Sequence, residues 1–143
     1  TMINMGNTTV DDVGIIELPQ VRTEGHGAIV FYEESPSLPF SPKRVFYLYD
    51  IPAGESRGAH AHKECHQLLV AVSGSFEVEI DDGNFQSRFS LSQPTQGLHI
   101  PPGVWAAEVN FSGGAICLVL ASEEYAESDY IRTMEKFKAW KSK

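Results

Sequence analysis

The sequence is poor in cysteine and in clustered basic residues, and each shortage excludes a class of protein. Only Cys65 and Cys117 are present, too few for the disulfide framework of a small secreted domain. Lys and Arg number 11 against 19 Asp and Glu, and no window gathers the basic residues that a nucleic-acid surface needs. We therefore expect reduced thiols and no nucleic-acid partner.

Long apolar runs are also missing, since none approaches the roughly 20 residues that a membrane-spanning helix requires. The first residues lack the basic and then apolar order of a secretory signal. These features predict a cytoplasmic protein without a membrane partner. The 143 residues suffice for a domain with its own core. We predict one domain over residues 1–143, in which residues 1–12 are irregular.

Short segments with strand character, separated by turn signals, dominate the chain. The clearest one alternates apolar Phe76, Val78 and Ile80 with polar neighbours, and it ends in the hairpin signal Asp-Asp-Gly-Asn at 81–84. Repetition of this pattern predicts an all-β fold, an antiparallel barrel or sandwich whose edges close on each other. The expected strands are 13–18, 28–32, 44–50, 67–72, 76–80, 85–91, 97–100, 106–111 and 115–121.

The C-terminal segment departs from this pattern because its apolar residues recur at helical spacing. Ser128 is a suitable N-cap, and Tyr130, Met134 and Phe137 form one apolar stripe. We predict a short helix over residues 128–141 that packs against the outside of the barrel.

Two histidines one residue apart, His60 and His62, are the most informative feature of the sequence. On an extended strand, the period of two places both imidazoles on one face of the sheet, close enough to act on one small molecule or one metal ion. Two such rings inside an apolar core would each need polar partners. This requirement favours a functional role over a structural one.

Two stretches around this pair resemble the motifs of the cupin superfamily. The first spans residues 54–74 and has Gln67 where the usual glutamate ligand stands. The second spans residues 97–110 and has Ala106 where the usual histidine stands. This resemblance implies a double-stranded β-helix, also called a jelly-roll barrel.

Shorter segments resemble a narrower group, the dTDP-4-keto-6-deoxyglucose 3,4-ketoisomerases or WxcM-like cupins. The resemblance implies a homodimeric isomerase without metal or other cofactor, which moves the ketone of a dTDP-linked 4-keto-6-deoxyhexose from C4 to C3 during the synthesis of surface sugars. The matching segments are 43–47, 57–63, 81–83, 104–105 and 128–132.

The resemblance also implies roles for individual residues. One histidine of the pair would take the C3 proton, giving an enediolate, and return a proton to C4, because neutral imidazole is a suitable base near pH 7. His60 is the expected base and His62 its orienting or relaying partner, although the sequence leaves their order open. The implied substrate-binding residues are Arg44, Tyr47, Arg57, Gln67, His99 and Trp105.

Phe46 and Ala106 depart from the isomerase pattern, which usually has a tyrosine and a histidine at these positions. Without the tyrosine hydroxyl, a candidate proton relay between the two sugar oxygens is lost, so either another group replaces it or the reaction differs. The candidates are Tyr47, Tyr49, His26 and His99.

Two alternatives stay open. One is another cupin enzyme, either an epimerase of a related keto-sugar or a metal-dependent enzyme in which His66 or His99 joins the histidine pair as a third nitrogen ligand. The other is a sugar-nucleotide-binding cupin without catalysis, which Phe46 and Ala106 favour.

Overall fold

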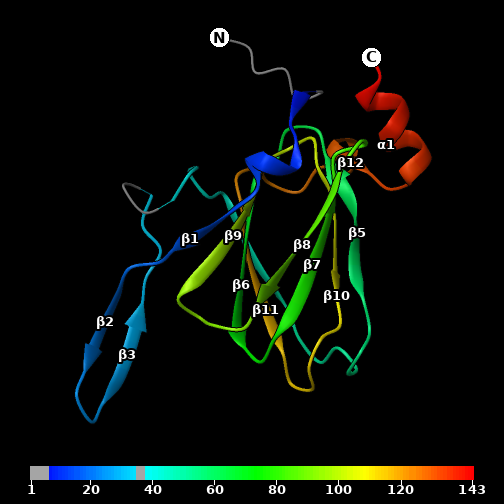
Figure 1. Cartoon of the computed structure of the whole chain (residues 1–143). Helices are drawn as coiled ribbons and strands as arrows, with labels where there is room; N and C mark the ends of the chain where they lie inside the picture. The colour runs from blue at the N-terminus through cyan, green and yellow to red at the C-terminus, as the bar shows by residue number, and fades with distance from the viewer. Residues whose placement is uncertain (1–6, 35–37) are drawn as a thin grey trace.

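The computed structural model describes residues 7–34 and 38–143 and contains two five-stranded antiparallel sheets that face each other (Figure 1). In spatial order, the first sheet comprises β1 (Gly14–Glu17), β9 (Gln96–Ile100), β6 (Gln67–Ser73), β11 (Ile116–Ala121) and β4 (Arg44–Leu48). The second comprises β12 (Tyr130–Ile131), β5 (Arg57–His62), β10 (Trp105–Val109), β7 (Phe76–Asp81) and β8 (Gln86–Leu91). The predicted all-β jelly-roll fold is confirmed.

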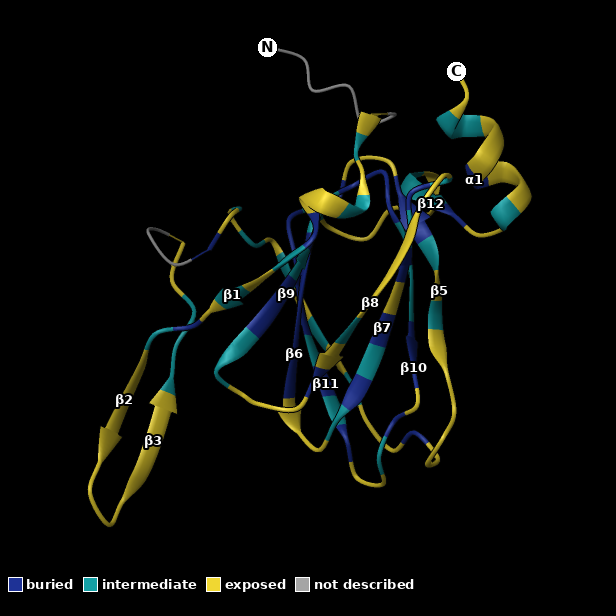
Figure 2. Cartoon of the chain, viewed as in Figure 1, coloured by how far each residue is buried: buried dark blue, intermediate teal, exposed yellow. Residues whose placement is uncertain are grey.

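The core lies between the two sheets, where inward side chains of both pack together (Figure 2). The predicted alternation on β7 is present, with Phe76, Val78 and Ile80 at most 1% exposed. Burial of such side chains stabilises a fold by roughly 1.5–3 kcal/mol each. The sheets therefore form a firm frame for the polar side chains that also point inward.

A hairpin of β2 (Gln20–Thr23) and β3 (Gly27–Val30) projects away from the barrel (Figure 1). The sequence predicted its second strand but not β2, whose four residues are all exposed and carry no buried alternation. His26 lies in the exposed turn at the tip of this hairpin. Its position removes His26 from the interior of its own barrel.

The predicted helix over residues 128–141 is wrong in its first part. Residues Tyr130–Ile131 form β12, which pairs with β5 at His62 and Ala61. The helix α1 covers Met134–Lys141, and the Thr133 hydroxyl caps it by accepting a hydrogen bond from the Lys136 N–H at 3.2 Å. Pairing with β5 overrides the helical pattern because it satisfies backbone groups beside a buried strand.

Half of the predicted irregular start, residues 1–6, lies outside the described residues. The short 3-10 helix η2 (Val10–Asp12) follows, and the Val10 N–H donates to Oδ2 of the buried Asp82 at 2.9 Å. No helix in the part of the chain that the structure describes is long and apolar enough to cross a membrane.

Candidate active site

A cavity of about 260 Å³ opens beside His60, and we call it the His60 cavity. Hollows of about 430, 510 and 660 Å³ lie elsewhere, but no histidine is among the described residues that line them. The smaller cavity therefore carries the chemistry that the histidine pair suggests. Its apolar wall includes Phe46, Leu48 and Val119, and its polar side chains are Arg57, His60, Gln67, Glu108, Tyr130 and Arg132.

A β-bulge in β5 aims two of these side chains into the cavity. His60 lies opposite Ala106 and Arg57 lies opposite Glu108, so three steps along β5 match two steps along β10. Gly58, inside the bulge, has φ +74, a conformation that glycine adopts without a Cβ penalty. In a regular strand, Arg57 and His60 would face opposite sides of the sheet. The bulge brings both to one cavity.

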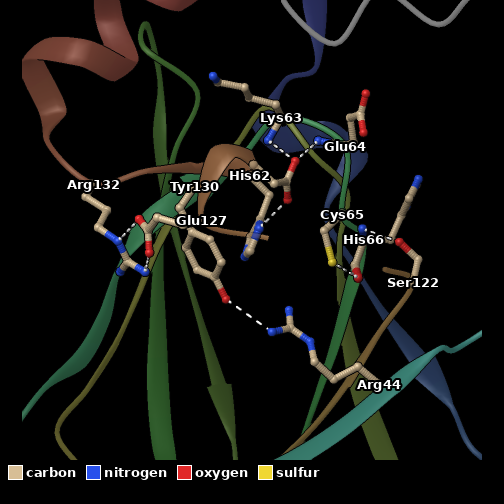
Figure 3. A network of polar contacts seen from close by, with 11 residues as sticks. Arg44, His62, Lys63, Glu64, Cys65, His66, Ser122, Glu127, Tyr130 and Arg132 are labelled. Atoms are coloured by element: carbon tan, nitrogen blue, oxygen red, sulfur yellow. Dashed lines mark hydrogen bonds and ion pairs between the residues drawn. The ribbon is translucent and has the colours of Figure 1, made fainter. Parts of the chain in front are cut away.

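His62 lies behind His60 and is buried. Its ring, labelled in Figure 3, is held by Asp129. The Nδ1 of His62 is 2.7 Å from Oδ2 of Asp129. Burial alone would raise the pKa of Asp129. Hydrogen bonds from His62 and from the Glu64 backbone have a larger, opposite effect, so the pKa of Asp129 lies below its ordinary value. Because an ionised carboxylate only accepts, Nδ1 of His62 carries the proton and donates it. The other ring nitrogen, Nε2, is buried and has no hydrogen-bond partner among the described residues.

His60 packs edge-on against its neighbour and borders the cavity. The ring centroids of His60 and His62 are 5.0 Å apart and their planes meet at 89°. Burial lowers the pKa of His60 to about 4, assisted by His62 and by the charges of Arg132 and Arg44. His60 is therefore a neutral imidazole near pH 7, the form that accepts a proton.

Two arginines approach this region from opposite sides (Figure 3). The Arg44 Nη1 donates to the Tyr130 hydroxyl at 3.5 Å, and its guanidinium lies 5.2 Å from the centre of the Phe46 ring. The Arg132 guanidinium lies 4.3 Å from the centre of the Tyr130 ring and pairs with Glu127 at 2.6 Å. Together with Arg57, these cations suit an anionic ligand.

Five of the predicted site residues gather here. His60, Arg57 and Gln67 line the cavity, and His62 lies directly behind His60. Arg44 lies on the inward face of β4, one of the two faces that the sequence left open for it. It is linked to the cavity through its hydrogen bond to Tyr130.

The structure does not bring Tyr47, Trp105 and His99 to the His60 cavity of their own chain, so a substrate-binding role for them stays a prediction. Tyr47 is 60% exposed, on the face of β4 opposite the cavity. Trp105 packs against Phe137 of α1, at a centroid distance of 6.0 Å, because the alternation on β10 turns it outward. Strand periodicity indicates which residues share a face, but not which face is inside.

His99 pairs with His66 on the outer side of the first sheet. Its strand neighbour is Leu68, which belongs to the outer apolar cluster, and Nε2 of His99 is 3.0 Å from Nδ1 of His66. The sequence proposed either ring as a third nitrogen beside His60, and the arrangement contradicts this. Among the described residues, the one group with ligand atoms within 4.8 Å of each other is His62, Cys65 and Asp129.

Sequence analysis missed four residues of the site. Asp129, Tyr130 and Arg132 were assigned to a helix, although they fall in a segment that resembles the ketoisomerases. Glu108 was not singled out. A signal existed, because Glu108 follows Ala106 by two residues and so shares its strand face, opposite the histidine strand.

Comparison with known proteins identifies the family of this chain. The family model FdtA, described as WxcM-like, C-terminal, matches residues 11–142. A TDP-4-oxo-6-deoxy-alpha-D-glucose-3,4-oxoisomerase of Aneurinibacillus thermoaerophilus is 42% identical over 120 residues, which are 84% of this chain and 86% of the relative.

Two solved structures are also similar over nearly their whole length. A 3,4-ketoisomerase from Helicobacter canadensis matches with a TM-score of 0.88 and 36% identity, covering 92% of this chain and 98% of the other. The sugar 3,4-ketoisomerase QdtA from Thermoanaerobacterium thermosaccharolyticum, in complex with TDP, matches with a TM-score of 0.89 and 31% identity, covering 94% and 97%.

Proposed function

The chain belongs to the WxcM-like, C-terminal family and is a sugar-nucleotide 3,4-ketoisomerase, and we propose that it moves the ketone of TDP-4-keto-6-deoxyglucose from C4 to C3 with His60 as the base. The observation that carries the role of His60 is its position: it is the histidine that borders the cavity, whereas His62 is buried behind it. A surface-sugar pathway, implied by the sequence resemblance, is the expected setting.

The reaction requires a proton to leave C3 and another to reach C4. A hydrogen beside a carbonyl is weakly acidic, so the site needs a base that is neutral at working pH and lies over that carbon. His60 meets the first condition because its pKa, lowered to about 4, leaves the ring uncharged near pH 7. It takes the C3 proton, an enediolate forms, and the imidazolium returns a proton to C4.

His62 and Asp129 support this step by fixing the ring beside His60. The carboxylate of Asp129 holds the proton on Nδ1 of His62, and two backbone N–H groups, of Lys63 and Glu64, fix the carboxylate at 3.1 and 2.6 Å. The ring of His62, fixed in this way, packs edge-on against His60 at a centroid distance of 5.0 Å and so supports the orientation of the His60 ring. His62 is a positioning residue in this proposal.

The arginines supply the positive charge for the substrate. Arg57 lines the His60 cavity and stabilises either the enediolate or the diphosphate. Arg132, which directly follows β12, borders the same cavity. QdtA, a structural relative at 31% identity, holds TDP, which supports a TDP-linked sugar as the ligand.

Incubation of the protein with TDP-4-keto-6-deoxyglucose in heavy water tests the proposed function. We expect NMR to show the 3-keto isomer, with deuterium at C4 of the product, because the proton on His60 exchanges with solvent during the reaction. A substrate that binds without isomerisation or exchange would contradict the proposal and favour the non-catalytic alternative.

We also propose a homodimer, with the cytoplasmic location staying a prediction from the sequence. Val21 and Ile29 of the projecting hairpin are 55% and 66% exposed, and Val45 and Tyr47 on the outer face of β4 are 62% and 60% exposed. A lone two-stranded hairpin is marginally stable in water, so a second copy that covers these side chains would stabilise it.

Light scattering coupled to size-exclusion chromatography measures this assembly. We expect a particle with twice the mass of the chain at micromolar concentration, and Ile29→Asp should shift it toward the single chain because a charge would then be buried at the contact. A wild-type particle with the mass of one chain would remove the homodimer.

A further inference from the structure

The His60 cavity contains a carboxyl group that the reaction described above does not use. Glu108 is 8% exposed, and its Oε2 is shielded from solvent and has no hydrogen-bond partner among the described residues. Space for this carboxyl comes from Gly58, because a Cβ there would overlap Oε2. A buried carboxyl oxygen without a partner destabilises a fold, so its presence needs a reason.

Ketone migration needs more than the transfer of carbon-bound protons. The oxygen at C4 must gain a proton and the oxygen at C3 must lose one, and this requires a group that gives and accepts protons near both. Phe46, on the cavity wall, has no proton to give. Within one chain, the substitutes predicted from the sequence lie away from this cavity: Tyr47 and Tyr49 are 60% and 64% exposed, His99 is on the outer side of the sheet, and His26 is at the hairpin tip.

We propose that Glu108 is the acid–base group that carries the proton between the two sugar oxygens. The proposal rests on the ketoisomerase function. Glu108 borders the cavity together with His60. It lies on β10, which pairs with the histidine strand β5, and its register partner there is Arg57. Glu108 thus approaches the substrate from the strand next to the bulge in β5.

The protons and electron pairs balance over one turnover. His60 takes the C3 proton, the C–H pair becomes the C3–C4 double bond, and the carbonyl π pair moves to O4. Glu108 gives its proton to O4, and its carboxylate then takes the proton of the O3 hydroxyl. The freed pair forms the C3 carbonyl, the double-bond pair takes the proton from His60 at C4, and both residues return to their starting states.

The protonation state of Glu108 suits this role. Burial raises its pKa to about 7, against smaller lowering effects of a hydrogen bond with its own backbone and of the Arg57 charge. The carboxyl is therefore protonated in about half of the molecules at pH 7 and in most of them below it, and it ionises readily.

Other charged or ionisable groups also face Glu108. On β5, these are the guanidinium of Arg57 and the imidazole of His60, whose pKa burial lowers to about 4. On β11, burial holds the pKa of Cys117 well above its ordinary value. The Tyr130 phenol and the Arg132 guanidinium border the same cavity.

The test compares Glu108→Gln with wild-type enzyme in heavy water. Glutamine preserves the shape of the side chain but cannot exchange a proton as an acid. We expect ketone migration to slow by about 100-fold or more. Washing of deuterium into C3 of unreacted substrate, which needs His60 alone, should stay within about fivefold of wild type. Glu79→Gln is the control, because Glu79 is an exposed carboxylate paired with Arg88 on the outer face of β7.

Each outcome decides the proposal. Wild-type migration in Glu108→Gln, or equal loss of migration and exchange in a variant that still binds TDP, overturns it. Selective loss of migration in Tyr130→Phe, with Glu108→Gln unaffected, would assign the relay to the Tyr130 phenol instead. A wild-type protein that gives neither exchange nor product would refute the ketoisomerase function itself.

A measurement on the wild-type enzyme keeps the test valid if Glu108→Gln does not fold. Because Glu108 must start protonated, kcat should decrease as pH rises through about 7. A rate that stays constant from pH 6 to pH 9, with TDP affinity also constant, would overturn the proposal.

Discussion

Substitution of His60 by asparagine lowers kcat for ketone migration by about 10³-fold or more, within the range for loss of a general base. Asparagine retains hydrogen-bonding atoms near the ring position but has no basic nitrogen. His60 is the histidine that borders the cavity, and its lowered pKa makes it the neutral base at working pH. NMR of the sugar product measures the rate, and calorimetric titration with TDP measures binding.

Binding and chemistry should separate in this variant. The affinity for TDP should change by less than about threefold, because the arginines rather than His60 supply the charge for the diphosphate. His66→Asn is a matched control, since His66 lies in the outer pair with His99 and should leave kcat nearly unchanged. Retained turnover in His60→Asn would remove His60 from the mechanism, whatever its affinity for TDP.

The second large effect is expected from Asp129→Asn, which should lower kcat by about 100-fold, the upper range for loss of a residue that orients another. The new amide group would donate to Nδ1 of His62, whereas the carboxylate accepts from it. The ring proton of His62 then moves to Nε2, the nitrogen buried beside His60. The ring that packs edge-on against His60 thereby changes its tautomer, and the orientation of His60 is no longer supported as in wild type.

A readout of the tautomer separates this effect from simple unfolding. Nitrogen-15 NMR of labelled histidine should show the proton on Nε2 in the variant and on Nδ1 in wild type. The amide oxygen still accepts from the backbone of Lys63 and Glu64, so the free energy of unfolding should decrease by no more than about 2 kcal/mol. Asp81→Asn is the control, since Asp81 likewise accepts from a backbone N–H, that of Gly83, but outside the cavity. An unchanged kcat with a switched tautomer would show that His62 does not support His60.

The tertiary pairing of the C-terminal segment explains the main error of sequence analysis in the fold. Residues 128–141 have an apolar stripe at helical spacing, yet Tyr130 and Ile131 pair with β5 and the helix begins only at Met134. Local periodicity does not record which other strand has free backbone groups nearby. The position of Asp129 against His62 depends on this pairing and was therefore unpredictable from the segment alone.

Strand periodicity also limited what the sequence could show of the site. It separated Arg44 from Tyr47 and His60 from Ala61 correctly, since successive residues face opposite sides. It did not show that β5 contains a bulge at Gly58, which turns Arg57 to the same cavity as His60. Sequence analysis did not identify Glu108, because its role depends on the neighbouring strand β5, with which β10 pairs.

By itself, the sequence determined the all-β class, most of the strands, the family and the histidine pair, because alternation, turn signals and motif spacing are local properties of the chain. Tertiary structure decided which histidine borders the cavity, which carboxylate holds the other, and that Glu108 is buried beside them. These relations join residues far apart in the sequence, and they depend on strand register and on which sheet face is enclosed. Neither is specified until the two sheets pack.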